Sequence, residues 1–153
     1  MKQGLTPLWT DDMVEDFFDR FINRAEEQIL KNLQRAGELF VKNARLYGSY
    51  KDQTGNLRSS IGYIIIKDGD VLSENFQLSD KGTDRHSGLK QGRKLIKEIA
   101  EMYPNGYVLI GVAGMEYAAC VEAMGYNVVT GACIQCEEDL KRVSKRIFDR
   151  LYG

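Results

Sequence analysis

Apolar residues recur every three or four positions along the first third of the chain. They include Val14, Phe17, Phe18, Phe21, Ala25, Ile29, Leu33, Ala36, Phe40 and Ala44. This spacing is that of one face of an α-helix, so the sequence predicts a long helix over residues 12–45. Asp12 with Glu15 resembles a capping box at its start. At ~1.5 Å per residue the helix would span roughly 50 Å, so one end is expected to extend beyond the core of so small a domain.

Strand patterns follow the helix. Thr54 is expected to cap a short turn, and the β-branched run from Ile64 to Ile66 is typical of a strand. Asp68-Gly69 predicts a two-residue hairpin turn, because a type I′ turn requires positive φ. The four expected strands cover residues 62–67, 70–77, 107–112 and 126–130.

Two further helices are predicted, over residues 88–103 and 133–152, the first of them inserted after the hairpin and ended by Pro104. The expected order of elements, with hairpins and without repeated strand–helix–strand units, indicates an α+β fold with helices packed on a small antiparallel sheet of about four strands. The sheet with its inserted helix should occupy residues 54–130. A single domain is expected over residues 1–153, with residues 1–11 flexible.

Length and composition fit one soluble globular domain. The chain has 153 residues, 43% of them hydrophobic, and a formal net charge of −1, so its overall charge does not favour binding to nucleic acid or to an anionic membrane. The first residues show no signal-peptide pattern and no run reaches the length of a membrane span. Synthesis in the cytoplasm without membrane contact is therefore expected.

Catalytic patterns are not identified. His86 is the only histidine, the carboxylates are scattered, and no glycine-rich phosphate loop occurs. Cys133 and Cys136 form a C-x-x-C pair at a helix start, which could exchange thiols or, with Cys120 and His86, bind a metal. They could equally be small apolar residues that begin the stripe of the last helix. We therefore expect no enzymatic activity, no cofactor and no small-molecule substrate, with a thiol redox or metal-binding protein as the alternative.

Basic residues concentrate between residues 81 and 97, a segment that contains six lysines and arginines and a single acidic residue. Lys90, Arg93, Lys94 and Lys97 belong to the inserted helix. Such a segment could contact a phosphate backbone without sequence preference, or could simply be a solvated helix face.

Two short motifs carry a resemblance to a known family. The stretch DQTGNLRSSI (residues 52–61) resembles the D-T-G-N-L-R-x-S-I motif of the gene-product-ten-like family of tailed bacteriophages. The stretch YVLIGVAGMEYAACVEAMG (residues 107–125) is similar to that family's strand ending in V-x-I-G, followed by Y-A-x-Y-V-E and a glycine. This chain departs from the pattern at the inserted Gln53, at Cys120 and in the helix 88–103, which suggests a divergent prophage member.

Members of that family are minor tail, tail-completion or head–tail joining proteins. The resemblance implies that this chain is a virion protein, made in the bacterial cytoplasm, that assembles as a homo-oligomeric ring at the neck or tail end. Its expected partners are tail-tube, connector or neck proteins, with nonspecific contact to packaged DNA through the basic segment as an addition. The interface candidates are Arg58, Asn56, Tyr117 and Glu122, for which the alternative is a capped turn and ordinary packing.

Overall fold

The computed structural model describes residue 4 and residues 6–115, 118–125 and 127–152, with side chains described as far as Arg150. The chain divides into two compact units, Met1–Lys31 and Asn32–Gly153. Helix α1 (Asp11–Leu46) contributes its first part to one unit and its remainder to the other.

The first unit consists mainly of the first part of α1. Thr10 caps this helix, because its carbonyl oxygen accepts the amides of Met13 and Val14 at 3.1 and 3.2 Å and its hydroxyl accepts the Met13 amide at 3.3 Å. The predicted capping box at Asp12 is therefore wrong by two positions. Asp11 and Asp12 lie in the first turn, where negative charge complements the helix dipole.

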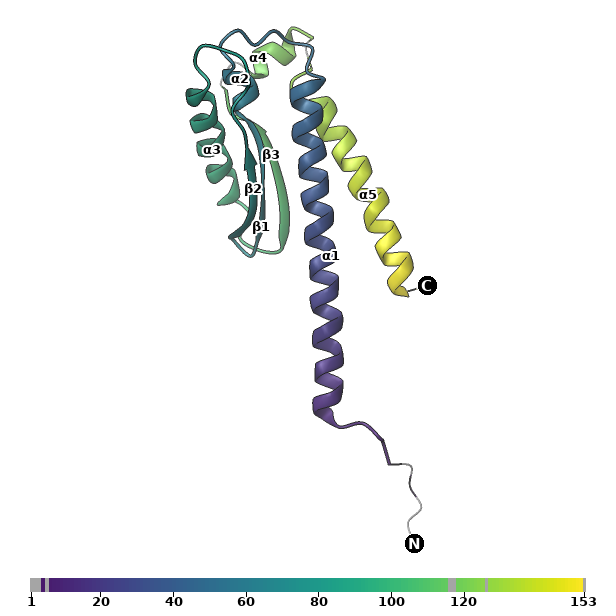
Figure 1. Cartoon of the computed structure of the whole chain (residues 1–153). Coiled ribbons are helices and arrows are strands. Elements are labelled where there is room, and N and C mark those ends of the chain that lie inside the picture. The colour runs from purple at the N-terminus through teal and green to yellow at the C-terminus, as the bar shows by residue number, and fades with distance from the viewer. Residues whose placement is uncertain (1–3, 5, 116–117, 126, 153) are drawn as a thin grey trace. The chain divides into compact units, whose positions relative to one another are not determined.

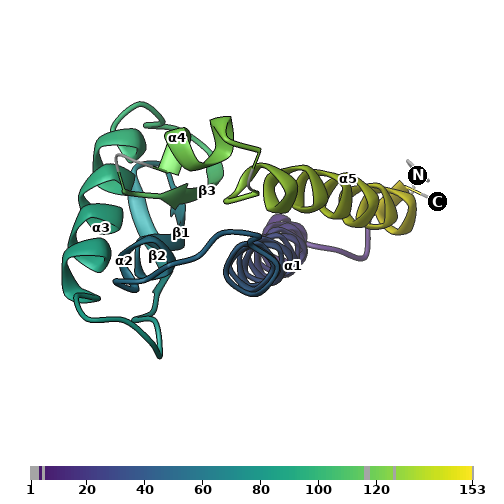
Figure 2. The same cartoon turned by 90° about the horizontal axis from the view of Figure 1, so that it is seen from above.

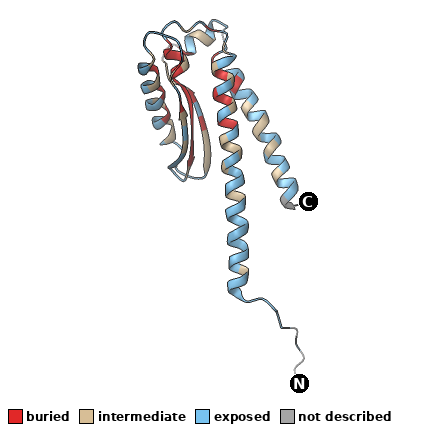
Figure 3. Ribbon diagram, in the orientation of Figure 1, coloured by how far each residue is buried: buried red, intermediate tan, exposed pale blue. Residues whose placement is uncertain are grey.

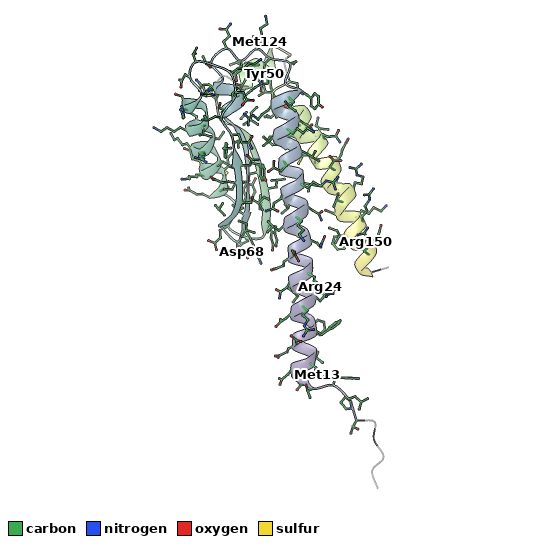
Figure 4. All side chains as sticks on the ribbon, in the orientation of Figure 1. Met13, Arg24, Tyr50, Asp68, Met124 and Arg150 are labelled. Atoms are coloured by element: carbon green, nitrogen blue, oxygen red, sulfur yellow. The ribbon has the colours of Figure 1, made fainter. Side chains whose placement is uncertain are left out.

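The apolar face of the first unit is exposed. Met13, Phe17, Phe18, Phe21 and Ile22 are between 45% and 66% accessible to solvent. Figure 3 shows this part of α1 almost free of buried residues, and Figure 4 shows its side chains, from Met13 to Arg24, projecting from the helix on several sides. The periodicity that predicted the helix is thus confirmed, although this part of its apolar face is not covered.

The second unit is built on an antiparallel sheet of three strands. Strands β1 (Ile61–Lys67), β2 (Asp70–Phe76) and β3 (Tyr107–Ala113) lie in the order β2-β1-β3. The central strand β1 is buried from Ile61 to Ile66, which explains its continuous apolar run.

Helices cover both faces of the sheet. Tyr63 of β1 lies against Gly37 of α1, and Gly111 of β3 lies against Phe40. Ile64, the next residue of β1, belongs to the core on the other face, together with Ile96 of α3 (His86–Ala100). Neighbouring strand residues point to opposite faces, so α1 and α3 sandwich the sheet, as Figures 1 and 2 show.

The α+β prediction is confirmed, but the fourth strand is not formed. Tyr126 lies outside the described residues, and residues 127–129 are not in a strand. The amides of Val128, Val129 and Thr130 instead bond the carboxylate of Glu122 and lead into the last helix. Backbone donors held by a side chain are not available to a sheet ladder.

Three further helices complete the second unit: α2 (Asn56–Ser59), α4 (Ala118–Ala123) and α5 (Thr130–Tyr152). Helix α5 begins three residues earlier than predicted, and α3 covers residues 86–100 instead of 88–103. Ala36 and Leu39 of α1 line one narrow groove with Leu140 and Val143 of α5. None of the helices in the described ranges combines the length and apolar character that crossing a membrane requires.

Candidate interface around the α2 turn

The α2 turn is held by its own sequence. Gly55 adopts φ of +76°, a conformation that favours glycine, and a Cβ there would lie 2.2 Å from the carbonyl oxygen of Lys81. The carboxylate of Asp52 accepts the amide of Arg58 at 2.7 Å. The hydroxyl of Thr54 accepts the amide of Asn56 at 3.3 Å, but the N-cap of α2 is Gly55, so the cap predicted at Thr54 is wrong by one position.

Asn56 ties this turn to the start of α3. Its side chain is buried; the amide oxygen accepts the Gly88 backbone N–H at 2.7 Å, and the amide nitrogen donates to Asp84 at 3.3 Å. The pKa of the Asp84 carboxyl is lowered mainly by the hydrogen bond from Ser87 and, to a smaller extent, by the hydrogen bond from Asn56. A Cβ on Gly88 would lie 2.0 Å from the Asn56 carbonyl oxygen, so the two backbones are in direct contact. Asn56 therefore has a structural role within the chain.

Arg58 lies between the turn and the end of α1. Its Nε donates to the carbonyl oxygen of Arg45 at 3.0 Å, and its guanidinium lies 5.1 Å from the ring centroid of Tyr50. A carbonyl in the last turn of a helix lacks a helical partner, so this bond caps α1. The two terminal nitrogens of Arg58 make no hydrogen bond to the residues that the structure describes.

A basic cleft of about 560 Å³ lies beside Arg58. It is lined by the end of α1, α2, the end of β2 and the loop that follows. Its charged residues are the cations Lys42, Arg45, Arg58 and Lys81 and the anions Glu38 and Asp80. We call this region the basic cleft.

Besides Arg58, two charged residues that line the basic cleft already make hydrogen bonds within the chain. Glu38 accepts hydrogen bonds from the Tyr63 hydroxyl at 2.8 Å and from Asn75 at 2.9 Å. The pKa of Tyr63 is raised to about 12, mainly by burial and further by the hydrogen bond to Glu38 and the charge of Glu38. Arg45 donates to the Leu78 carbonyl at 3.1 Å, and burial is the main reason that its pKa is lowered. The basic cleft keeps an excess of positive charge that suits carboxylate groups of a partner.

Glu122 caps helix α5 from α4. One oxygen accepts the amides of Val128, Val129 and Thr130 at 3.2, 2.8 and 2.9 Å, and the other accepts the Thr130 hydroxyl at 2.7 Å. Burial by itself would raise the pKa of Glu122, but these hydrogen bonds outweigh it and lower the pKa. The interface role expected for Glu122 stays a prediction, and that for Tyr117 concerns a residue outside the described part of the chain.

The basic segment forms an exposed face of α3. Lys90, Arg93, Lys94 and Lys97 are all exposed and line one groove of about 410 Å³ together with His86 and Leu89. Arg93 pairs with Glu74 at 3.2 Å, and Lys94 lies 4.0 Å from Glu98. The structure brings these four residues together but keeps them on a different helix from Arg58.

The cysteine pair lies at the start of α5. Cys133 is exposed, and the half-buried Cys136 lies 3.7 Å from the carbonyl oxygen of Ala36, to which its thiol donates. Burial raises the pKa of both thiols, and the charge of Glu122 adds to the shift at Cys133. A raised pKa lowers the thiolate fraction that thiol exchange requires. Among the described residues, no three His, Cys, Asp or Glu side chains lie together as a metal site.

The sequence did not identify Lys42 and Arg45 as neighbours of Arg58. In the sequence, both residues are notable only as basic residues near the end of the long helix, and the helix dipole alone accounts for such positions. Compared with family models, curated proteins and solved structures, the chain matches none.

Proposed function

We propose that this chain is a structural protein of a tailed bacteriophage or prophage. It acts at the head–tail neck or at the end of the tail, where it completes the tail or joins it to the head by protein–protein assembly. The proposal rests on the resemblance of residues 52–61 and 107–125 to the gene-product-ten-like family and on one observation of the structure. That observation is the exposed apolar face of α1.

This apolar face favours an assembly role. Single exposed apolar residues are common on protein surfaces, but a continuous row of large ones marks a contact site. Phe17, Phe18 and Phe21 lie within five residues and are each at least 45% accessible. Burying such rings against a partner removes apolar surface from water at a gain of roughly 25 cal/mol per Å². The partners that we propose for this apolar face are tail-tube, connector or neck proteins of the particle.

The α2 turn and the basic cleft provide a second contact region. The turn is rigid, because Asp52, Asn56 and Gly55 fix its backbone, and it presents the terminal nitrogens of Arg58 beside the basic cleft. Arginine can bond a carboxylate with two parallel hydrogen bonds, which gives such a contact direction as well as strength. Within a homo-oligomeric ring in the virion, this region would bind acidic groups of a neighbouring protein.

Deletion of the gene from an inducible prophage that encodes it tests the proposal. Electron microscopy of the lysate should then show heads and tails that are separate or incorrectly joined, and wild-type protein supplied in trans should restore joined particles. Normal, infectious tailed particles from the deletion strain would contradict the proposed function.

Complementation with two matched variants links that function to α1. The variant Phe17→Ser with Phe21→Ser removes two exposed rings and should fail to restore joined particles, although its circular dichroism spectrum should stay that of the wild type. Asn23→Ser with Glu27→Ser changes two exposed polar residues of the same helix and should restore them. Equal complementation by both variants would show that the apolar face is not the contact surface.

A further inference from the structure

Two helices of this chain carry charge stripes of opposite sign and identical spacing. On α1, Asp12, Glu15, Asp16 and Asp19 form the acidic stripe. On α3, Lys90, Arg93, Lys94 and Lys97 form the basic stripe. Each stripe follows the spacing i, i+3, i+4, i+7, which places four side chains on one face of a helix over roughly 10 Å.

Both stripes face solvent. All eight side chains belong to exposed residues. The opposite face of α3 is anchored in the core through Gly88, Gly92 and Ile96, so the basic stripe is held on a fixed helix. The groove along it, about 410 Å³ and lined also by Leu89, offers some apolar surface beside the charges.

The contacts that these stripes make within the chain are few and exposed. On the basic stripe, Arg93 pairs with Glu74 at 3.2 Å, and Lys94 lies 4.0 Å from Glu98. On the acidic stripe, Asp16 pairs with Arg20. Ion pairs at such exposed positions contribute little and exchange partners readily. Most of the charge of both stripes is therefore free to meet a partner.

We infer that the basic stripe of one copy binds the acidic stripe of a second copy. The two stripes have the same length, the same number of charges and opposite sign, so each copy carries both halves of one contact. Such a contact joins different surfaces of the two copies, and repetition of it generates a ring or a filament. This inference rests on the proposed function, since it names the contact that would hold the ring together.

A nucleic-acid duplex is the other class of partner for the basic stripe. The chain as a whole has a net charge of −1, so its overall charge does not attract a phosphate backbone. A second copy provides an acidic complement of matched length, which favours the protein partner.

A charge-swap experiment tests the inference with the full-length chain. One variant reverses the basic stripe by Arg93→Glu, Lys94→Glu and Lys97→Glu. A second reverses the acidic stripe by Glu15→Lys, Asp16→Lys and Asp19→Lys. A control makes the same charge change as the basic-stripe variant, but on exposed residues of α5, by Lys145→Glu, Arg146→Glu and Arg150→Glu. Circular dichroism checks that each variant is folded.

Sedimentation velocity at low and high ionic strength measures the association. The wild type and the control should self-associate at low salt and dissociate at high salt, since exposed charges are screened. Either swapped variant alone should show an association constant at least roughly tenfold lower than that of the wild type. An equimolar mixture of the two swapped variants should recover association, because the acidic α3 of one then meets the basic α1 of the other.

Three outcomes would overturn the inference: a wild type that stays monomeric at low salt, a mixture that associates no better than its components, or a control that weakens association as much as the stripe variants. Duplex DNA binding, followed by fluorescence anisotropy, is measured in parallel. Loss of DNA binding in the basic-stripe variant with unchanged self-association would assign the stripe to DNA and contradict the inference. Any of these results leaves the particle phenotype of the gene deletion as a separate test of the proposed function.

Discussion

Gly37 marks the point where α1 comes closest to the sheet. A Cβ at this position would lie 2.6 Å from ring atoms of Tyr63, which is itself only 2% exposed. Real Cβ atoms do not approach another heavy atom so closely, and the buried ring has no room to move away. Glycine usually weakens the interior of a helix, whereas here Gly37 permits close packing against Tyr63.

The first prediction concerns Gly37→Ala. Alanine in a helix is intrinsically favourable by about 1 kcal/mol relative to glycine, so a purely local effect would stabilise the protein. The clash with Tyr63 should reverse this sign and destabilise the fold by about 1–3 kcal/mol. Thermal unfolding measures the change, with Gly4→Ala, which would meet no atom within 4 Å, as the control. An unchanged or raised Tm for Gly37→Ala would contradict the close packing of α1 against Tyr63.

Arg58 shows what the sequence could and could not reveal at the level of one residue. The motif around it predicted a capped turn, and the turn is present. Its partners, the Arg45 carbonyl and the Tyr50 ring, are supplied by the end of α1 and the loop after it. No local pattern specifies such a contact, because it depends on where the long helix ends relative to the turn.

The second prediction concerns Arg58→Ala. Loss of the bond to Arg45 and of the contact with the Tyr50 ring should lower the free energy of unfolding by about 1–2 kcal/mol. Chemical denaturation measures the loss, and Arg24→Ala, on an exposed part of α1, is the control and should change little. Equal stability of the wild type and Arg58→Ala would mean that Arg58 does not help to hold the turn.

Among the elements, the segment between α4 and α5 shows why the sheet has three strands. The apolar pair Val128-Val129 predicted a strand, since β-branched residues favour extended structure. Glu122 is six residues before Val128, and its carboxylate bonds three successive amides there. A cap supplied by a side chain of the preceding helix overrides the local preference. The strands whose pairing is supported by the hairpin at Asp68-Gly69 were predicted correctly.

The third prediction concerns the pH dependence that Glu122 adds. Folding lowers the pKa of the Glu122 carboxyl below its ordinary value of 4.5. At a pH above 4.5, the ionised carboxylate therefore stabilises the folded state. That stabilisation is lost as the pH falls from this value through the lowered pKa of the folded state. Glu122→Gln lacks the charge and should be less stable by about 1–2 kcal/mol at neutral pH.

Denaturation curves of wild type and Glu122→Gln across the acid range test this sign. The difference in stability should be largest at neutral pH and should shrink as the pH falls from 4.5 through the lowered pKa of the folded state, where the wild-type carboxyl becomes protonated. Other carboxyls with lowered pKa, among them Asp84, are common to both proteins and cancel in the difference. A difference that stays constant or grows on acidification would show that Glu122 does not cap α5 as an anion.

At the scale of the whole molecule, helix α1 is much longer than the strands of the sheet. A strand of seven residues spans about 23 Å, whereas α1, with 36 residues, spans about 54 Å. Each strand is therefore less than half as long as this helix. Periodicity predicts which face of a helix is apolar, but it cannot tell whether that face meets the same chain or another one.

The proposed assembly role would use the exposed apolar face of α1, which lies on the same helix as buried core residues. Ala36, Phe40 and Ala44 are buried on α1, while Phe17 and Phe18, on the same helix, are exposed. A single helix thus combines a part whose apolar residues are buried with a part whose apolar residues are exposed.

Quantitative mass spectrometry of gradient-purified particles from an induced prophage tests the central claim most directly. If the chain is a neck or tail-end protein, its peptides should remain with intact particles after stringent washing, in a fixed number of copies per particle. Intact, infectious particles that lack these peptides would contradict the account.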